Sequence, residues 1–150
     1  ATVVAKLFLQ SGADQAFFGE KDYQQLMVVK RMARDLDIPI EVIGCPTVRE
    51  ASGLAMSSRN MRLSPQAVEV AGQVNPMMEA AAARLRAGED YAPLEAEMRA
   101  SLADLGFSDV EYIDLRSAED LSAMTRLDAP ARLFIAAWLD GVRLIDNIAV

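Results

Sequence analysis

Residues 16–43, AFFGEKDYQQLMVVKRMARDLDIPIEVI, contain the pattern that decides the fold. The first apolar residues end at Gly19 and predict a buried strand that turns sharply into the next element. From Asp22 to about Leu36, apolar residues recur at helical spacing. The β-branched residues of 38–43 then predict a second strand. Strand, helix and strand form one parallel β-α-β unit.

A parallel sheet of only two strands would leave one face uncovered, and parallel sheets are normally covered on both faces. Residues 2–10 add only a short helix, and the chain opens at Ala1 directly in an apolar pattern. We therefore expect more sheet upstream or in a partner.

The rest of the chain predicts a small α+β domain with two helices and an antiparallel sheet. Residues 47–65 have no sustained period and predict a long loop, which is typical of functional segments. The apolar spacing predicts a long helix from Val68 to Leu85, with a kink at Pro76, and a second helix around 94–105 that packs against it. Later elements are a strand at 110–115 and a hairpin turning at Asp140 and Gly141, a residue pair that accepts positive φ. We place the domain boundaries at 1–48, 49–65 and 66–150.

Composition excludes several classes of protein. Apolar residues make up 52% of the chain and charged residues 25%, which is typical of a globular protein rather than a disordered one. A net charge of -7 argues against nucleic acid or an anionic membrane as a partner. There is no histidine and one cysteine, so neither a zinc site nor a disulfide framework is expected, and a reducing, cytoplasmic setting is favoured. We expect no metal-ligating residues in the chain itself.

The segment FGEKDYQQL at 18–26 has the composition of a phosphate-binding helix start. Ligands of open α/β sheets bind where a strand ends, and a helix N-terminus offers unpaired N–H groups to an anion. Lys21 could hold a phosphate, Asp22 could accept from a ribose hydroxyl, and Gln25, one turn on, could face the same crevice. The alternative is structural: Asp22 caps the helix, Lys21 is solvated, and the glutamines cover surface.

The segment GLAMSSRN at 53–60 is the second candidate. The hydroxyls of Ser57 and Ser58 and the guanidinium of Arg59 could wrap phosphate oxygens with charge-assisted hydrogen bonds. The alternative is a turn or helix cap made by the serines, with Arg59 exposed. Elsewhere, Trp138 is expected in the core and Arg49 at the surface.

Both segments, in this order, closely resemble the pantoate-β-alanine ligase family, the pantothenate synthetases. The resemblance runs over the whole chain but covers only the second half of such an enzyme. It implies that the parallel unit ends a Rossmann-like nucleotide-binding domain. It also implies a ligase that uses ATP and Mg²⁺ to convert pantoate to pantoyl adenylate, with release of pyrophosphate, and then joins it to β-alanine with release of AMP.

The resemblance also implies roles for individual residues. The residues expected to lie along ATP in the first segment are Gly19, Glu20, Lys21 and Asp22, with Lys21 near the phosphates. In the second segment, the backbones of Val48 and Met56 would meet adenine, while Ser57, Ser58 and Arg59 would clasp the triphosphate as the counterpart of a KMSKS loop. Gln25 would hold pantoate. The catalytic set is then Lys21, Ser57, Ser58 and Arg59.

One large departure concerns histidine. The family has an early His-containing motif that stabilises phosphates, whereas this chain has none. We therefore expect a fragment that lacks the N-terminal half of the enzyme and is inactive unless complemented, with homodimerisation left open. Two alternatives remain: another adenylate-forming nucleotidyltransferase, such as a tRNA-charging relative, or a non-catalytic interaction or dimerisation module.

Overall fold

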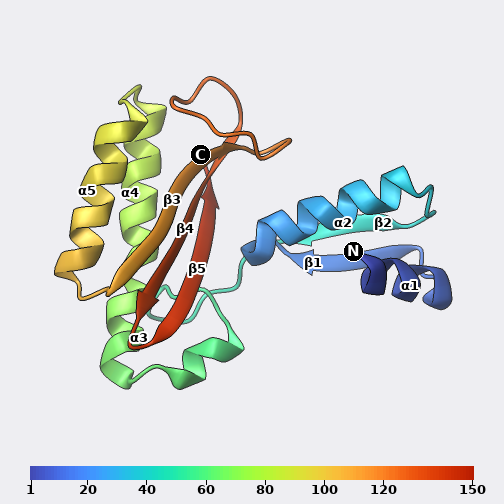
Figure 1. The fold of residues 1–150 in the computed structure, drawn as a ribbon, viewed down its shortest axis with the longest axis horizontal. Helices are drawn as coiled ribbons and strands as arrows, with labels where there is room; N and C mark the ends of the chain where they lie inside the picture. The colour runs from blue at the N-terminus through green and yellow to red at the C-terminus, as the bar shows by residue number, and fades with distance from the viewer. The chain divides into compact units, whose positions relative to one another are not determined.

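The computed structural model describes residues 1–150 and divides into two compact units, Ala1–Thr47 and Val48–Val150 (Figure 1). Each unit has its own apolar core, and each is described separately below. None of the helices combines the length and the apolar character needed to cross a membrane.

The first unit is the predicted β-α-β arrangement with a preceding helix. Its elements are α1 (Thr2–Ser11), β1 (Gln15–Gly19), the 3-10 turn η1 (Glu20–Asp22), α2 (Tyr23–Asp35) and β2 (Glu41–Cys45). Strands β1 and β2 pair in parallel, with Phe17 opposite Ile43. The predicted crossover is therefore confirmed, and only the short turn η1 separates the end of β1 from the start of α2.

The core of this unit lies on one face of the two-stranded sheet. Its buried members are Phe8, Val29, Met32, Ala33 and Ile38. Phe8 and the half-buried Phe18 meet edge to face with their ring centroids 6.2 Å apart. Phe17, which points away from this core, is 64% exposed. Within this unit, the second face of the sheet lacks the cover that a parallel sheet normally has.

The end of α2 differs from the sequence prediction. The helix ends at Asp35, and Leu36 is exposed rather than part of the apolar stripe. Asp37 has a φ of 50°, so the chain turns sharply and Ile38 takes the buried place instead. Strand β2 starts at Glu41, three residues later than predicted, because Pro39 has no N–H to donate to a strand partner.

The second unit is an antiparallel sheet covered by helices. Its elements are η2 (Ser58–Arg62), α3 (Pro65–Gly72), α4 (Val74–Arg86), α5 (Tyr91–Asp104), β3 (Asp109–Ser117), β4 (Ala131–Leu139) and β5 (Val142–Ala149). The strands follow each other in the order β3-β4-β5. Helices α4 and α5 lie side by side against the sheet (Figure 1). The predicted hairpin is confirmed, since Asp140 and Gly141 both have positive φ, 53° and 72°.

One predicted helix is two in the structure. The expected helix from Val68 to Leu85 is interrupted at Gln73, between α3 and α4, rather than kinked at Pro76. Pro76 has no N–H for the carbonyl of Gly72, and its ring crowds that carbonyl. The helix therefore stops at Gly72, and Pro76 falls in the first turn of α4, where a missing N–H is harmless.

The core of the second unit lies between the helices and one face of the sheet. Met78, Ala82 and Leu102 from the helices are fully buried there against Leu133 of the central strand β4.

Trp138 is only half-buried, so the expectation of a core position is wrong. Its indole N–H donates to Glu111 Oε1 at 2.6 Å, and the same carboxylate accepts hydrogen bonds from both Nε and Nη2 of Arg143. These side chains come from β4, β3 and β5 and join all three strands. The Arg143 guanidinium, with help from the Trp138 indole, holds the pKa of Glu111 below its usual value.

We expect the free energy of unfolding to reflect this carboxylate. A carboxyl whose pKa is lowered by folding stabilises the protein above its unfolded pKa and loses this effect as the pH falls through its folded pKa. The stability difference between the parent chain and Glu111→Gln should therefore be largest near neutral pH and shrink below pH 4.5. Urea denaturation followed by the fluorescence of Trp138 measures it. Glu79→Gln, an exposed change on α4, is the control, and a difference for Glu111→Gln that is constant with pH would contradict the assignment.

Candidate functional site

The first predicted group lies where β1 runs into α2. Gly19 ends β1 with φ −65° and ψ 132°, a conformation open to any residue, so the turn does not itself require glycine. A Cβ placed on Gly19 would meet no atom within 4 Å. The absence of a side chain instead leaves bare main chain next to open space, where a ligand can approach closely.

Glu20, Lys21 and Asp22 form the single 3-10 turn η1 that joins β1 to α2. The Glu20 side chain lies over β2: a Cβ atom placed on Gly44 of that strand would be 3.1 Å from Glu20 Oε1. Lys21 is half-buried. Asp22 occupies the N-cap position of α2 without making a side-chain cap hydrogen bond, so its exposed carboxylate does not have the capping role of the structural alternative.

Gln25 is exposed in the first turn of α2. It follows Lys21 by four residues and Asp22 by three, and both of these residues lie in η1, before α2 begins at Tyr23. Gln24 is also exposed but lies about 100° further round the helix axis. The residues that follow β1 thus include a cation, a carboxylate and an amide close together in the sequence.

The second predicted group belongs to residues 48–62, called here the 48–62 segment. It folds back on itself: Arg49 and Ala55 form an antiparallel bridge, and the Met56 N–H donates to the Val48 carbonyl at 2.9 Å. Both Val48 and Met56 are exposed. This pairing places the main chains of Val48 and Met56, the two residues predicted to meet adenine, next to each other.

The residues after Met56 form the short helix η2. The Ser57 hydroxyl accepts a hydrogen bond from the Arg59 N–H at 3.2 Å, so Ser57 acts as its cap, as the structural alternative proposed. Ser58 and Arg59 are exposed. A hydroxyl that accepts one main-chain bond still has its own proton to donate, so the cap does not exclude contact with an anion.

An open surface cavity of about 610 Å³ adjoins the 48–62 segment. Its lining includes Met56, Ser57 and Ser58 but neither Val48 nor Arg59. Four lining residues were not singled out from the sequence: Glu50, Asn60, Met61 and Val68. No local pattern marks them, because their shared position depends on how the segment folds.

Asn60 braces one end of the segment. Its buried amide donates to Glu50 Oε1 at 2.6 Å and to the Ala55 carbonyl at 3.1 Å, and so ties η2 to the preceding turn. The backbone of α3 supports the same turn, because a Cβ on Gly72 would lie only 2.2 Å from the Ser52 carbonyl oxygen. This close approach is open only to glycine.

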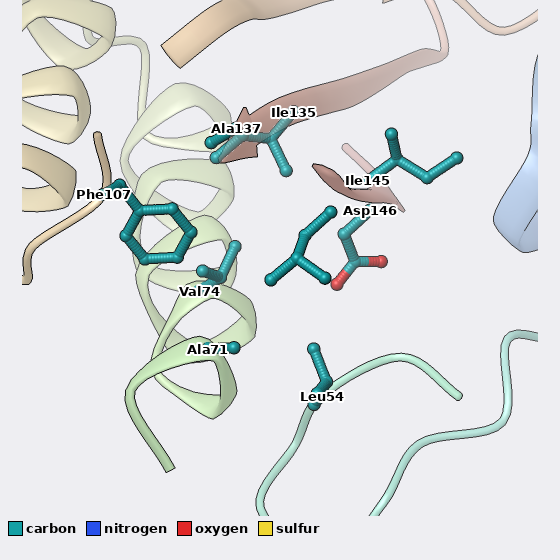
Figure 2. A pocket seen from close by; sticks show the side chains of 9 residues that line it. Leu54, Ala71, Val74, Phe107, Ile135, Ala137, Ile145 and Asp146 are labelled. Carbon is teal, nitrogen blue, oxygen red and sulfur yellow. The ribbon is translucent and has the colours of Figure 1, made fainter. Parts of the chain in front are cut away.

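Arg49 is not the surface charge expected from the sequence. Its guanidinium forms a two-point ion pair with Asp146 of β5, with Nη1–Oδ2 and Nη2–Oδ1 distances of 2.6 and 3.0 Å. Asp146 also lines a small internal cavity of about 20 Å³, roughly the space of one water, whose other walls are apolar. Figure 2 shows its carboxylate beside Leu54, at the edge of this apolar lining.

The two predicted groups lie in different units, the turn after β1 in Ala1–Thr47 and the 48–62 segment in Val48–Val150. No set of three or more His, Cys, Asp or Glu side chains is placed so that it could hold a metal ion.

Solved structures identify the class of protein that has this fold. The chain is similar to a pantothenate synthetase from Thermus thermophilus, with a TM-score of 0.90 and 41% identity over 98% of this chain and 53% of that one. It is also similar to a pantoate-beta-alanine ligase from Francisella tularensis, complexed with beta-gamma ATP and beta-alanine, with a TM-score of 0.68 and 30% identity over 99% of this chain and 48% of that one. The chain therefore has the fold of about half of a pantothenate synthetase.

Sequence comparison identifies the family. The chain is 84% identical over its whole length to the pantothenate synthetase of Ruegeria sp. (strain TM1040), of which it covers 54%, and 67% identical to that of Ruegeria pomeroyi, of which it covers 53%. Residues 1–149 match the pantoate-beta-alanine ligase family, and the chain belongs to this family. It spans about half the length of these curated relatives.

We expect Gly72→Ala to destabilise the second unit. Alanine favours a helix by about 1 kcal/mol over glycine, but its Cβ would clash with the Ser52 carbonyl oxygen, and overpacking of this kind costs about 1–3 kcal/mol or more. Urea denaturation should show a lower free energy of unfolding for Gly72→Ala. Gly19→Ala is the matched control, because its Cβ meets nothing within 4 Å. A Gly72→Ala chain as stable as the parent would contradict the close approach.

Proposed function

We propose that the full-length protein carrying this chain is an ATP-dependent ligase that condenses pantoate and β-alanine to pantothenate through a pantoyl adenylate. The observation that carries the proposal is the family match over residues 1–149, which includes both the turn after β1 and the 48–62 segment. Because the chain spans about half of its relatives, the activity is assigned to the whole protein. The isolated chain is proposed to be inactive alone.

The first step activates a poor acyl donor. A pantoate carboxylate oxygen attacks the α-phosphorus of ATP, the bond from that phosphorus to the β-phosphate oxygen breaks, and pyrophosphate leaves. Negative charge builds on the transferred phosphate, so fixed positive charge and N–H or O–H donors aimed at it lower the barrier. The chain offers Lys21 in one unit and Ser57, Ser58 and Arg59 in the other for this role.

The second step forms the amide. The β-alanine amine attacks the acyl carbonyl of pantoyl adenylate, the bond to the AMP oxygen breaks, and the amine loses a proton. Holding the adenylate and the amine in one site converts a bimolecular reaction into an effectively unimolecular one. Positioning is thus the main contribution that the chain's residues make to this step.

The turn after β1 is proposed to bind the ribose, the phosphates and pantoate. Bare main chain at Gly19 lets the nucleotide approach, and Glu20 completes the turn beneath it. Asp22, whose carboxylate makes no cap hydrogen bond, can accept from a ribose hydroxyl. Lys21 supplies positive charge to the phosphates, and Gln25, in the first turn of α2, offers both a donor and an acceptor to pantoate.

The 48–62 segment is proposed to bind adenine and the triphosphate. The Met56 N–H and the Val48 carbonyl bond to each other, which leaves the Val48 N–H and the Met56 carbonyl for adenine. Ser58 and Arg59 are exposed next to them. The 48–62 segment and the turn after β1 are thus each proposed to bind part of ATP.

Mg²⁺ is proposed to accompany ATP. Such ions are held chiefly by substrate phosphates and water with one or two carboxylates, which fits a chain without a cluster of three or more metal-ligating side chains. When bound, Mg²⁺ neutralises phosphate charge. We further propose a cytoplasmic setting and no nucleic-acid partner, in keeping with one cysteine and a net charge of -7.

The interaction module remains a second candidate, favoured by the exposed Phe17 on the uncovered sheet face. A module of this kind needs no ATP. Under the leading proposal, further sheet of the full-length protein would instead cover this face, and that protein would catalyse. Homodimerisation stays open in either case.

The decisive experiment measures pyrophosphate release by the full-length protein. With ATP and Mg²⁺ present, release should require pantoate, and pantothenate should accumulate only when β-alanine is added. The isolated chain is the comparison and should release none. Release that depends on an amino acid and tRNA would favour the other nucleotidyltransferase, and tight self-association without ATP binding would favour the module.

We expect Lys21→Glu in the full-length protein to abolish activity while the fold survives. Reversing the charge next to the phosphates removes stabilisation of the transition state, and losses of about 100-fold or more in kcat are typical for such groups. Steady-state kinetics and thermal unfolding measure the two effects. Lys30→Glu, an exposed change further along α2, is the control. Activity of Lys21→Glu within a few fold of the parent would remove Lys21 from the site.

We expect Gln25→Ala to raise the KM for pantoate and to leave the KM for ATP unchanged. Loss of one or two hydrogen bonds worth about 1 kcal/mol each corresponds to a change of roughly tenfold. Gln24→Ala is a matched control, since Gln24 is equally exposed in the same helical turn but faces another direction. Equal kinetics for the two variants would argue against the pantoate role.

A further inference from the structure

The ion pair between Arg49 and Asp146 is the feature that the proposed chemistry leaves unexplained. The Asp146 side chain is 8% exposed and that of Arg49 is 22% exposed. Asp146 lies on β5 next to apolar side chains that include Leu54 and Ile135 (Figure 2). Burying a carboxylate in such surroundings costs free energy unless it is paired with a cation. Removing one partner of a buried pair destabilises the fold strongly, because it leaves an unpaired buried charge. The pair must therefore be kept whole in the folded protein.

Both members of the pair are held by further hydrogen bonds. Asp146 Oδ1 accepts from the Asn147 N–H at 2.8 Å, which fixes the carboxylate on β5. Arg49 Nη1 donates to the Gly53 carbonyl at 3.1 Å as well as to Asp146. One guanidinium therefore ties the turn at 49–55 to the rigid sheet.

This bond network sets the course of the main chain up to Met56. Arg49 and Ala55 form a bridge, the Glu50 N–H donates to the Leu54 carbonyl at 2.8 Å, and Met56 pairs with Val48. Asn60 then clamps the other end of the same stretch. In the sequence, the exposed residues Ser58 and Arg59 lie between the Val48–Met56 pair and Asn60.

We propose that Arg49 is a positioning residue: by pairing with Asp146 it fixes the 48–62 segment so that Met56–Arg59 are preorganised for the adenine and phosphates of ATP. The inference rests on the proposed function and adds to it a residue that need not contact substrate. The inference also predicts different effects on the two substrates, because Gln25, the residue proposed to bind pantoate, belongs to the other unit.

The test uses the full-length protein with Arg49→Met and Arg49→Lys. Lysine keeps the charge but cannot make the two-point contact, and methionine keeps only the bulk. Displacement of positioning groups commonly costs about 10- to 100-fold, so kcat/KM for ATP should fall by that amount in Arg49→Met and by less in Arg49→Lys. The KM for pantoate should stay within about twofold of the parent.

Arg116→Met is the matched control. Arg116 also bonds a carboxylate, that of Asp114, and a main-chain carbonyl, that of Leu121, but it lies on β3. Its loss should lower the unfolding temperature without changing the KM for either substrate. A purely structural role of Arg49 would give the same result, with less folded enzyme and unchanged KM values.

Hydrogen exchange supplies a readout that does not depend on activity. The amides of Glu50 and Met56 should lose protection in Arg49→Met but not in Arg116→Met, while amides of β4 keep theirs. If hydrogen exchange is unchanged, or if both Arg49 variants keep the KM for ATP of an active parent, the inference about Arg49 is wrong. The proposed function is not affected by that result. If the parent protein releases no pyrophosphate in the presence of pantoate, the proposed function is wrong, and so is the role of Arg49 in ATP binding.

Discussion

A single carboxylate on the inner surface of the antiparallel sheet constrains much of the second unit. Asp146 lies where its neighbours are almost all apolar, so burying its charge is tolerable only with a fixed cationic partner. That partner, Arg49, comes from a stretch with no helix or strand of its own apart from one short bridge. The desolvation of one side chain thus requires an otherwise irregular loop to return to β5. Order in this loop follows from this ion pair together with the Asn60 hydrogen bonds and the Gly72–Ser52 contact, rather than from regular secondary structure.

Local chemistry explains why many elements could be predicted. Asp140 and Gly141 adopt the positive φ that their residue types accept, and the turn between β4 and β5 falls where the sequence places it. The helix stripe around Leu26 and Val29 is likewise buried as its spacing predicts. Errors occurred where a nearby residue imposed an additional constraint. Pro39 delays the start of β2, and Pro76 ends α3 at Gly72 instead of bending a continuous helix.

The candidate site was predictable only in part, because some of its contacts join residues close in the sequence and others join residues far apart. Ser57 and Arg59 interact over two residues, and the turn chemistry of serine suggested such a contact. Arg49 and Asp146 are 97 residues apart, and nothing in the sequence near either one indicates the pair. The contact of Gly72 with Ser52 is equally invisible, since a glycine near the end of a helix is most simply read as a helix terminator.

The long separation of Arg49 from Asp146 has a consequence for biosynthesis. Ribosomes deliver the loop before β5, so Arg49 emerges well before its carboxylate partner Asp146 has been made. The hairpin joining β4 and β5 closes over a few residues and can form quickly, whereas closure of the much longer loop carries a larger entropic cost. The Arg49 side of the segment proposed to hold a nucleotide therefore reaches its final form only after β5 has been made, and a chain truncated before β5 would lack this anchor.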